Sequence, residues 1–101
     1  MRTTPFRQAE AEALATMTPD ERARFDAAEA EEEARLQLAE LVYGARTRAG
    51  LTQAELARRM GTQQSVISAV ENGGQVPSVS TLWRIAHALN LRLTIDMAAA
   101  S

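Results

Sequence analysis

The spacing of apolar side chains changes along the chain and marks the predicted elements. Residues 4–17, rich in Ala and Glu, predict a frayed helix, and a longer helix is predicted from Thr18 to about Arg48. Apolar positions in the long helix are sparse before residue 36 and then close up into a stripe at helical spacing. The stripe consists of Leu38, Leu41, Val42 and Ala45. The earlier part has little to bury against its own core, so we expect it to stand in solvent or to meet another chain.

Start and stop signals delimit the long helix. Thr18 can cap its first turn, Pro19 suits the first helical position, and Glu21 completes a capping box. Gly50 ends the helix, since glycine adopts the left-handed conformation at low cost. Gly44 lies inside it and costs roughly 1 kcal/mol relative to alanine, which leaves the continuity of the helix at that point open.

Two short helices follow. Thr52, with Glu55 three residues later, forms a second capping box at the start of "QAELARRM", which stops at Gly61. The next helix is predicted from about Gln63 to Asn72. Its first residue stands where Ser or Thr is the usual cap, so Thr62 is expected to cap it instead.

A fourth short helix, "VSTLWRIAHAL", begins after Pro77 and Ser78. We expect Trp83 in the core, on one side of this helix with Val79, Leu82, Ala86 and Leu89. After it, "LRLTIDM" alternates apolar and polar residues, the two-residue period of a half-buried strand. The strand would offer an unpaired edge across which a second copy could pair.

Four positions counted from Gln53 fit a helix-turn-helix unit, in which a tight turn containing glycine joins two short helices. Ala57 is fifth and small enough for the next helix to cross it, and Gly61 is ninth and can take a positive φ in the turn. Ile67 and Val70 are fifteenth and eighteenth and form a buried edge. The alternative is a generic helical hairpin in a small bundle.

The segment 36–90, which contains "LTQAELARRMGTQQSVISAVENGG", resembles the helix-turn-helix domain of the Cro/phage-repressor type, also called the xenobiotic-response-element type. The predicted fold is all-α, a compact DNA-binding domain of four to five helices with a helical N-terminal extension and one short C-terminal β-strand. The expected parts are residues 1–34 as acidic extension, 35–90 as helix-turn-helix domain, and 91–101 as strand and tail.

The stretch "GTQQSVISAVENG" contains no Arg or Lys, although nucleic-acid affinity usually comes from cations at phosphates. A helix whose N-terminus faces the groove can still read bases: Gln64 can pair with adenine, and Ser65 and Ser68 can donate or accept at base edges. Gln63 completes the predicted base-reading set. Ala69 offers only a methyl contact, which indicates modest specificity per half-site and makes dimerisation more important.

The resemblance implies further roles. The residue matching Gln53 touches a phosphate, those matching Arg46 and Glu71 pair beside the DNA, and the one matching Asn72 lies near the backbone. Backbone N–H groups at the starts of the two short helices are expected to attract phosphates. The predicted DNA-backbone set is Gln53, Arg46, Arg48, Arg58, Arg59, Thr62 and Asn72.

Charge is divided unevenly. Residues 1–41 hold five Arg against ten acidic residues, a net charge of −5, and residues 42–101 hold six Arg against three, a net charge of +3. This division indicates different partners for the two parts, although a solvated acidic helix is an equal alternative for the first. The lack of cysteine fits a reducing cytoplasm, and neither a signal peptide nor a membrane span is predicted.

The layout is similar to antitoxins of the HigA-like class. The resemblance implies a repressor that binds its own operator and also neutralises a small basic mRNA-cleaving toxin of the RelE/HigB-like kind. The acidic extension suits a basic surface, and the candidate toxin contacts are Phe6, Leu14, Met17 and Phe25. The alternative is a stand-alone transcriptional regulator whose extra segments serve dimerisation. Either function predicts a homodimer on a pseudo-palindromic double-stranded operator.

An enzyme is not expected. His87 is the sole histidine, and no Cys/His cluster or glycine-rich phosphate loop accompanies it. The run Glu31–Glu33 is interpreted as a solvated helix face, because adjacent residues on one helix cannot converge on a metal ion. We therefore predict no catalytic residue, no cofactor and no metal.

Overall fold

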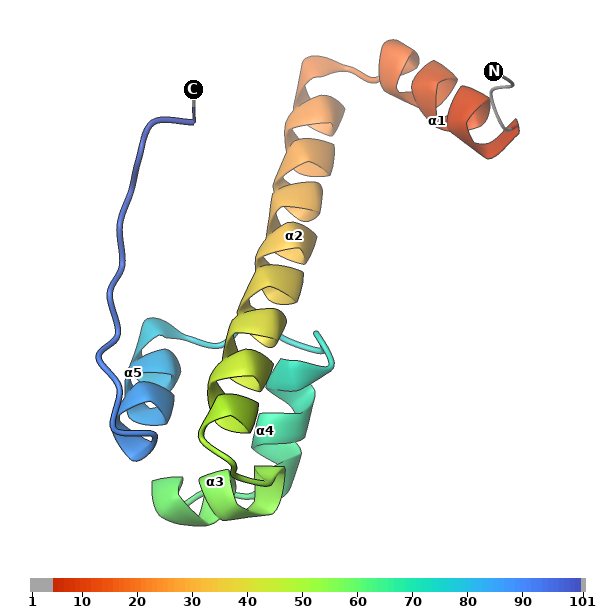
Figure 1. Cartoon of the computed structure of the whole chain (residues 1–101). Helices are drawn as coiled ribbons and strands as arrows, with labels where there is room; N and C mark the ends of the chain where they lie inside the picture. Colours follow the sequence, from red (N-terminus) through yellow and green to blue (C-terminus); the bar gives the residue numbers. More distant parts are fainter. Residues whose placement is uncertain (1–4, 101) are drawn as a thin grey trace. The chain divides into compact units, whose positions relative to one another are not determined.

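The computed structural model describes residues 5–100, and within that range it contains five helices and no strand (Figure 1). They are α1 (Pro5–Thr16), α2 (Pro19–Arg48), α3 (Gln53–Met60), α4 (Gln64–Glu71) and α5 (Val79–Ala88). The chain divides into two units, one up to Glu32 and one from Glu33, and the division falls inside α2. The predicted helical architecture is confirmed.

The N-terminal unit consists of α1 and the first part of α2. The Thr18 hydroxyl accepts a hydrogen bond from the backbone N–H of Glu21 at 3.1 Å, so α2 starts at the predicted cap. Arg22 and Asp26 form an i,i+4 ion pair at 3.3 Å. Apolar side chains are few, which agrees with the sparse pattern in the sequence.

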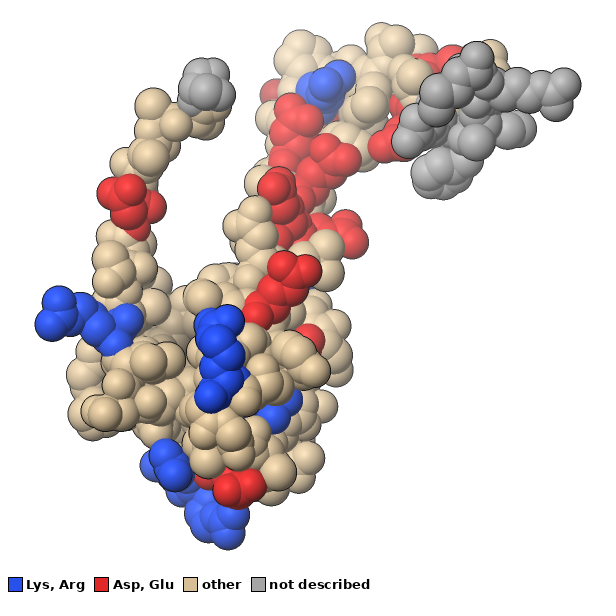
Figure 2. All heavy atoms as spheres, viewed as in Figure 1, with Lys and Arg blue, Asp and Glu red and all other residues tan. Residues whose placement is uncertain are grey.

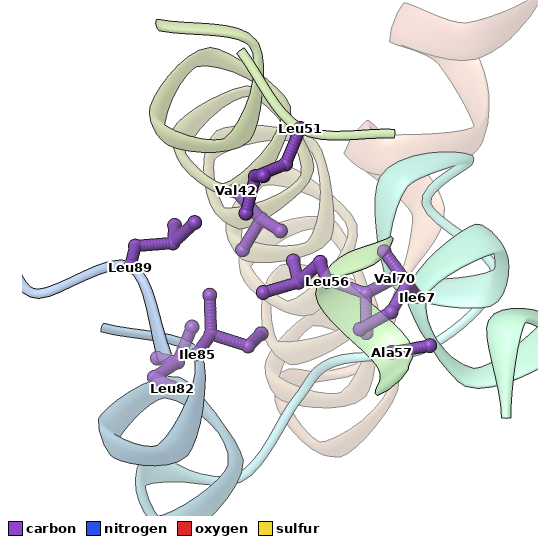
Figure 3. Close-up of a cluster of buried hydrophobic side chains, with 9 residues drawn as sticks. All are labelled: Val42, Leu51, Leu56, Ala57, Ile67, Val70, Leu82, Ile85 and Leu89. Atoms are coloured by element: carbon purple, nitrogen blue, oxygen red, sulfur yellow. The ribbon is translucent and has the colours of Figure 1, made fainter. Parts of the chain in front are cut away.

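The C-terminal unit is built around α3, which packs against both α4 and α5. Figure 3 shows the core, to which every helix of this unit contributes. The three apolar positions of the predicted helix-turn-helix spacing lie inside it: Ala57 is 2% exposed, Ile67 0% and Val70 1%. Gly61 has φ 68°, which supplies the left-handed turn between α3 and α4. The other members of the core are Val42, Leu51, Leu56, Leu82, Ile85 and Leu89.

Local hydrogen bonds fix the start of α3 and α5. Thr52 accepts from the Glu55 N–H at 3.1 Å, and the Glu55 carboxylate accepts from the Thr52 N–H at 3.2 Å, which completes the predicted capping box. These bonds with Thr52 lower the pKa of Glu55. Ser78 caps α5 by accepting from the Thr81 N–H at 3.0 Å. Helix α2 runs without interruption through Gly44 to Arg48, and Gly50 follows with φ 75°.

The expected cap of α4 is wrong. Gln63, not Thr62, is the N-cap residue, and its side chain makes no capping hydrogen bond. The extended backbone of Gln63, with ψ 149°, places the last non-helical residue one position later than expected. The Thr62 backbone N–H instead bonds to the Ala57 carbonyl at 2.9 Å, so Thr62 belongs to the turn that ends α3.

The expected burial of Trp83 is also wrong, because 58% of this residue is exposed. The buried positions of α5 are Leu82 and Ile85, followed by its C-cap Leu89. Since successive helical residues rotate by about 100°, a core face centred on these positions leaves Trp83 and Val79 outside it. The stripe predicted on α2 is only partly buried as well: Val42 is 2% exposed, whereas Leu41 is 50% exposed.

The C-terminal strand is not observed: residues 91–100 have no regular secondary structure. A strand needs a second backbone to pair with, and none is recorded for this segment within residues 5–100 of the single chain. Leu93 packs against the core, while Leu91 and Ile95 are 52% and 58% exposed. In the described part of the chain, no helix is long and apolar enough to cross a membrane.

Candidate nucleic-acid interface

Three segments of the C-terminal unit meet at the guanidinium group of Arg46, near the end of α2. Its Nε and Nη2 atoms donate to the two carboxylate oxygens of Glu71, the last residue of α4, at 2.7 and 2.8 Å. Its Nη1 atom donates to the carbonyl of Leu51, just before α3, at 2.7 Å. This two-pronged pairing fixes orientation as well as distance, and it agrees with the Arg–Glu pair that the resemblance implies.

The pair is shielded from water, with 10% of the Arg46 side chain and 4% of the Glu71 side chain exposed. The hydrogen bond to Glu71 raises the pKa of Arg46. Burial pushes the pKa of Glu71 upward, but the hydrogen bonds from Arg46 and Gln53 and the charge of Arg46 together lower it below its ordinary value. Both groups are therefore held ionised. Little of Arg46 remains for a phosphate, which indicates that it positions its neighbours.

Glu71 extends this network to the first residues of α3 and α4. The Gln53 side-chain amide donates to Glu71 Oε1 at 3.2 Å, and the Gln64 amide donates to Gln53 Oε1 at 3.5 Å. The two glutamines that begin the helices of the helix-turn-helix unit are therefore neighbours. The buried ion pair lies behind Gln53, while Gln64 is exposed.

The start of α4 presents the predicted base-reading residues to solvent. Gln63, Gln64 and Ser65 are exposed, and Ser68, one turn further on, is partly buried. The Ser65 hydroxyl donates to the Gln63 side-chain oxygen at 3.5 Å. Because no side chain caps α4, its first backbone N–H groups are suited to an anion. At α3, in contrast, Thr52 already occupies the Glu55 N–H.

The predicted contacts to the DNA backbone differ in how exposed their side chains are. Arg48 and Arg58 are exposed, as is Asn72, whose side-chain oxygen accepts the Gly74 N–H at 2.8 Å and shapes the turn after α4. Arg59 is exposed too, but its Nη1 atom lies 3.4 Å from the Ala88 carbonyl at the end of α5. Thr62 is partly buried in the turn. Figure 2 shows arginine side chains on the C-terminal unit and carboxylates following the N-terminal part of α2.

The candidate toxin contacts lie in the N-terminal unit. Leu14, Met17 and Phe25 are each partly buried. The side chain of Phe6 lies outside the part of the chain whose side chains are described. No group of three or more His, Asp or Glu residues that could hold a metal ion occurs in the described part.

Sequence reasoning missed a cluster on α5. Trp83 and His87 stack with ring centroids 5.1 Å apart and planes 5° from parallel. Next to them, Arg84 donates to the Met60 carbonyl at 2.8 Å. Ile85 was the residue in the sequence that could have revealed this cluster. If Ile85 instead of Trp83 is assigned to the buried face of α5, Trp83 is predicted to be exposed.

Comparison with known proteins places this geometry in a family. The family model described as helix-turn-helix matches residues 43–95. Antitoxin HigA1 of Mycobacterium tuberculosis is 41% identical over 64 residues, covering 63% of this chain and 42% of that protein. The chain thus spans less than half the length of this relative.

Two shorter relatives and one solved structure also match this chain. The ImmF control region 10 kDa protein of Bacillus phage phi105 is 37% identical over 59 residues, covering 58% of this chain and 66% of that protein. Antitoxin HipB of Escherichia coli is 37% identical over 59 residues, covering 58% and 63%. The structure of a HipB variant in complex with an O2 20mer aligns with a TM-score of 0.56 at 35% identity, covering 64% of this chain and 90% of that chain.

Proposed function

We propose that this chain, which belongs to the helix-turn-helix family, is a transcriptional repressor that reads its operator through Gln64 and the start of α4. The observation that carries the proposal is the network from Arg46 through Glu71 and Gln53 to Gln64. It restrains a side chain that can pair with adenine in the major groove. A restrained amide loses less conformational entropy on binding than a free one.

Affinity comes from groups around α4. The uncapped N–H groups of α4 attract one phosphate, and the exposed Arg48 and Arg58 neutralise others. Gln53, Arg59, Thr62 and Asn72 complete the proposed backbone set. Ser65, Ser68 and Gln63 adjust the fit to the base edges near Gln64.

Nuclease footprinting on the DNA upstream of the chain's own gene tests this function. The expected result is protection of a pseudo-palindrome whose half-sites are about 34 Å, one DNA turn, apart. No protection at any upstream position would contradict it.

A homodimer supplies the second half-site. The segment 91–100 carries exposed Leu91 and Ile95, and Leu91 lines a small apolar hollow together with Leu41 and Leu89. Packing of this segment against a second copy would bury those apolar side chains. Sedimentation should show a dimer, and a monomer at all working concentrations, with or without DNA, would contradict this proposal.

The antitoxin role is the second part of the proposal. HigA1 and HipB are named antitoxins, and the net charge of residues 1–41 is −5. Such a segment suits the basic surface of a RelE/HigB-like toxin, with Phe6, Leu14, Met17 and Phe25 as apolar contacts.

Co-expression with the product of the neighbouring gene tests the antitoxin role. The expected result is a complex that purifies intact and is lost when residues 1–34 are deleted. A complex that survives the deletion would move the contact to the C-terminal unit. The absence of any complex would favour a stand-alone regulator.

A further inference from the structure

A shallow hollow of about 250 Å³ lies between the end of α3 and α5, away from the network that orients Gln64. We call it the basic–aromatic hollow, and its lining residues are Arg59, Met60, Trp83, Arg84, His87 and Ala88. Among the described residues, its lining includes two arginines and no carboxylate. Nothing in the proposed reading of DNA uses Trp83, Arg84 or His87.

The hollow is restrained before anything binds to it. Trp83 stacks on His87 one turn later, which limits the rotation of the indole. Arg84 donates to the last carbonyl of α3 at 2.8 Å, and Arg59 lies 3.4 Å from the last carbonyl of α5. Each guanidinium uses one of its five N–H donors in that contact. An exposed, restrained tryptophan flanked by arginines is the composition of a protein–protein hot spot.

The chain also carries a surface of complementary character, on the N-terminal part of α2. Residues four apart on a helix share a face, so Glu21 and Glu29 flank Phe25, and Glu32 follows on the same side. We call these four residues the acidic stripe. The three carboxylates are exposed and Phe25 is partly buried. Arg22, three residues before Phe25, is paired with Asp26 at 3.3 Å.

We infer that the basic–aromatic hollow of one copy is a docking site for the acidic stripe of a second copy. Phe25 would lie against the Trp83 indole, and the flanking carboxylates would accept hydrogen bonds from Arg84 and Arg59. Base-edge and phosphate contacts are made mainly by polar and cationic side chains, whereas Trp, Met and Arg are enriched in protein interfaces. The composition of the hollow therefore favours protein over DNA. The inference stands whether or not the chain has a toxin partner.

Trp83 is the only tryptophan in the chain, so its fluorescence reports on the hollow directly. In full-length protein without DNA, acrylamide quenching of Trp83 should decrease as the protein concentration rises. The protection should disappear in about 1 M NaCl, where the Debye length is only about 3 Å. Quenching that does not depend on protein concentration, or protection that persists at high salt, would overturn the inference.

Variants locate the contact. Arg84→Ala and Glu29→Gln should each raise the concentration at half protection by roughly 1.5-fold to fivefold, the range of an exposed ion pair. Glu40→Gln is the matched control for Glu29→Gln, since it removes one exposed carboxylate of α2 outside the acidic stripe and should leave the protection unchanged. Arg84 is the arginine to vary, because Arg59 also belongs to the proposed DNA-contacting set. An equal effect of Glu29→Gln and Glu40→Gln would assign the protection to net charge and overturn the inference.

A charge exchange gives a test that does not depend on loss of function. Chains with Glu29→Arg should fail to protect Trp83, as should chains with Arg84→Glu, because each then brings like charges together. Mixing the two variants should restore protection, since every stripe in the mixture finds a hollow of opposite charge. Circular dichroism of each variant confirms that it is folded. Folded variants that show no protection when mixed would overturn the inference, as would protection of Trp83 by DNA alone.

Discussion

Arg46 donates hydrogen bonds to the Glu71 carboxylate and to the Leu51 carbonyl, and its side chain is only 10% exposed. Removing one partner of such a pair leaves the other buried and uncompensated. Glu71→Ala should therefore lower the free energy of unfolding by about 3–5 kcal/mol. In urea unfolding, the double variant Arg46→Met/Glu71→Leu should be less destabilised than either matching single variant, Arg46→Met or Glu71→Leu. A double variant whose loss equals the sum of the single losses would show that the two side chains do not interact.

The same pair makes stability depend on pH. Folding lowers the pKa of Glu71 from its ordinary value of 4.5, so its contribution is fully present above that pH. The contribution is lost as the pH falls through the lower pKa of the folded state. The urea midpoint of the wild type should therefore decrease on acidification below about pH 4.5 more steeply than that of Glu71→Gln. Parallel pH profiles for the two proteins would exclude Glu71 as the cause.

Gln64 is the residue whose proposed role concerns specificity and not only affinity. Gln64→Ala should cost roughly 1–3 kcal/mol of discrimination at one base pair, with a smaller loss on random DNA. Gln75→Ala, which removes an exposed glutamine from the loop after α4, serves as the control. Fluorescence anisotropy on operator and random duplexes measures both. An equal loss on the two duplexes would refute base reading by Gln64.

At the scale of elements, replacing glycine by alanine should have opposite effects on stability in α2 and in the turn after α3. Gly61 has φ 68°, so Gly61→Ala should destabilise the protein by about 1–2 kcal/mol although its Cβ would meet no atom. Gly44 lies inside α2, where alanine is favoured by about 1 kcal/mol, and its new Cβ would approach only the flexible end of Arg48, at 3.3 Å. Gly44→Ala should therefore raise the melting temperature and Gly61→Ala should lower it. A lower melting temperature for Gly44→Ala would mean that Arg48 cannot move.

Elements set by local chemistry could be predicted residue by residue. The capping box at Thr52 and the glycine at position 61 define α3 within a few residues of sequence, and α3 has the predicted bounds. Features that depend on distant partners could not be predicted in this way. Trp83 is exposed because the position of α3 decides which face of α5 is buried, and periodicity alone allows more than one face.

The prediction of a C-terminal strand was wrong for a related reason. Alternation in "LRLTIDM" describes side chains, whereas a strand also needs a second backbone. Within the site, the Arg46–Glu71 pair followed from the family resemblance. The hydrogen bond between Gln64 and Gln53 did not, because the two residues are eleven positions apart and meet only when α3 and α4 pack.

At the scale of the whole molecule, the chain joins an acidic segment to a basic helix-turn-helix unit, and each serves a different proposed partner. The basic unit is proposed to recognise DNA through the start of α4. The acidic segment is proposed to contact a toxin and, in its absence, the basic–aromatic hollow of a second copy. These two contacts would compete for Phe25. A bound toxin should therefore return the acrylamide quenching of Trp83 to the value measured at low protein concentration.

The central claim is that the chain binds one DNA sequence in preference to others. The most direct measurement is the affinity of the full-length protein for its own upstream DNA and for a scrambled duplex of equal length and composition, at one physiological salt concentration. Specific binding should be tighter by at least about 10³-fold, the lower end of the range for sequence-specific regulators. Equal affinity for the two duplexes would contradict the claim, because phosphate contacts alone would then account for all the binding.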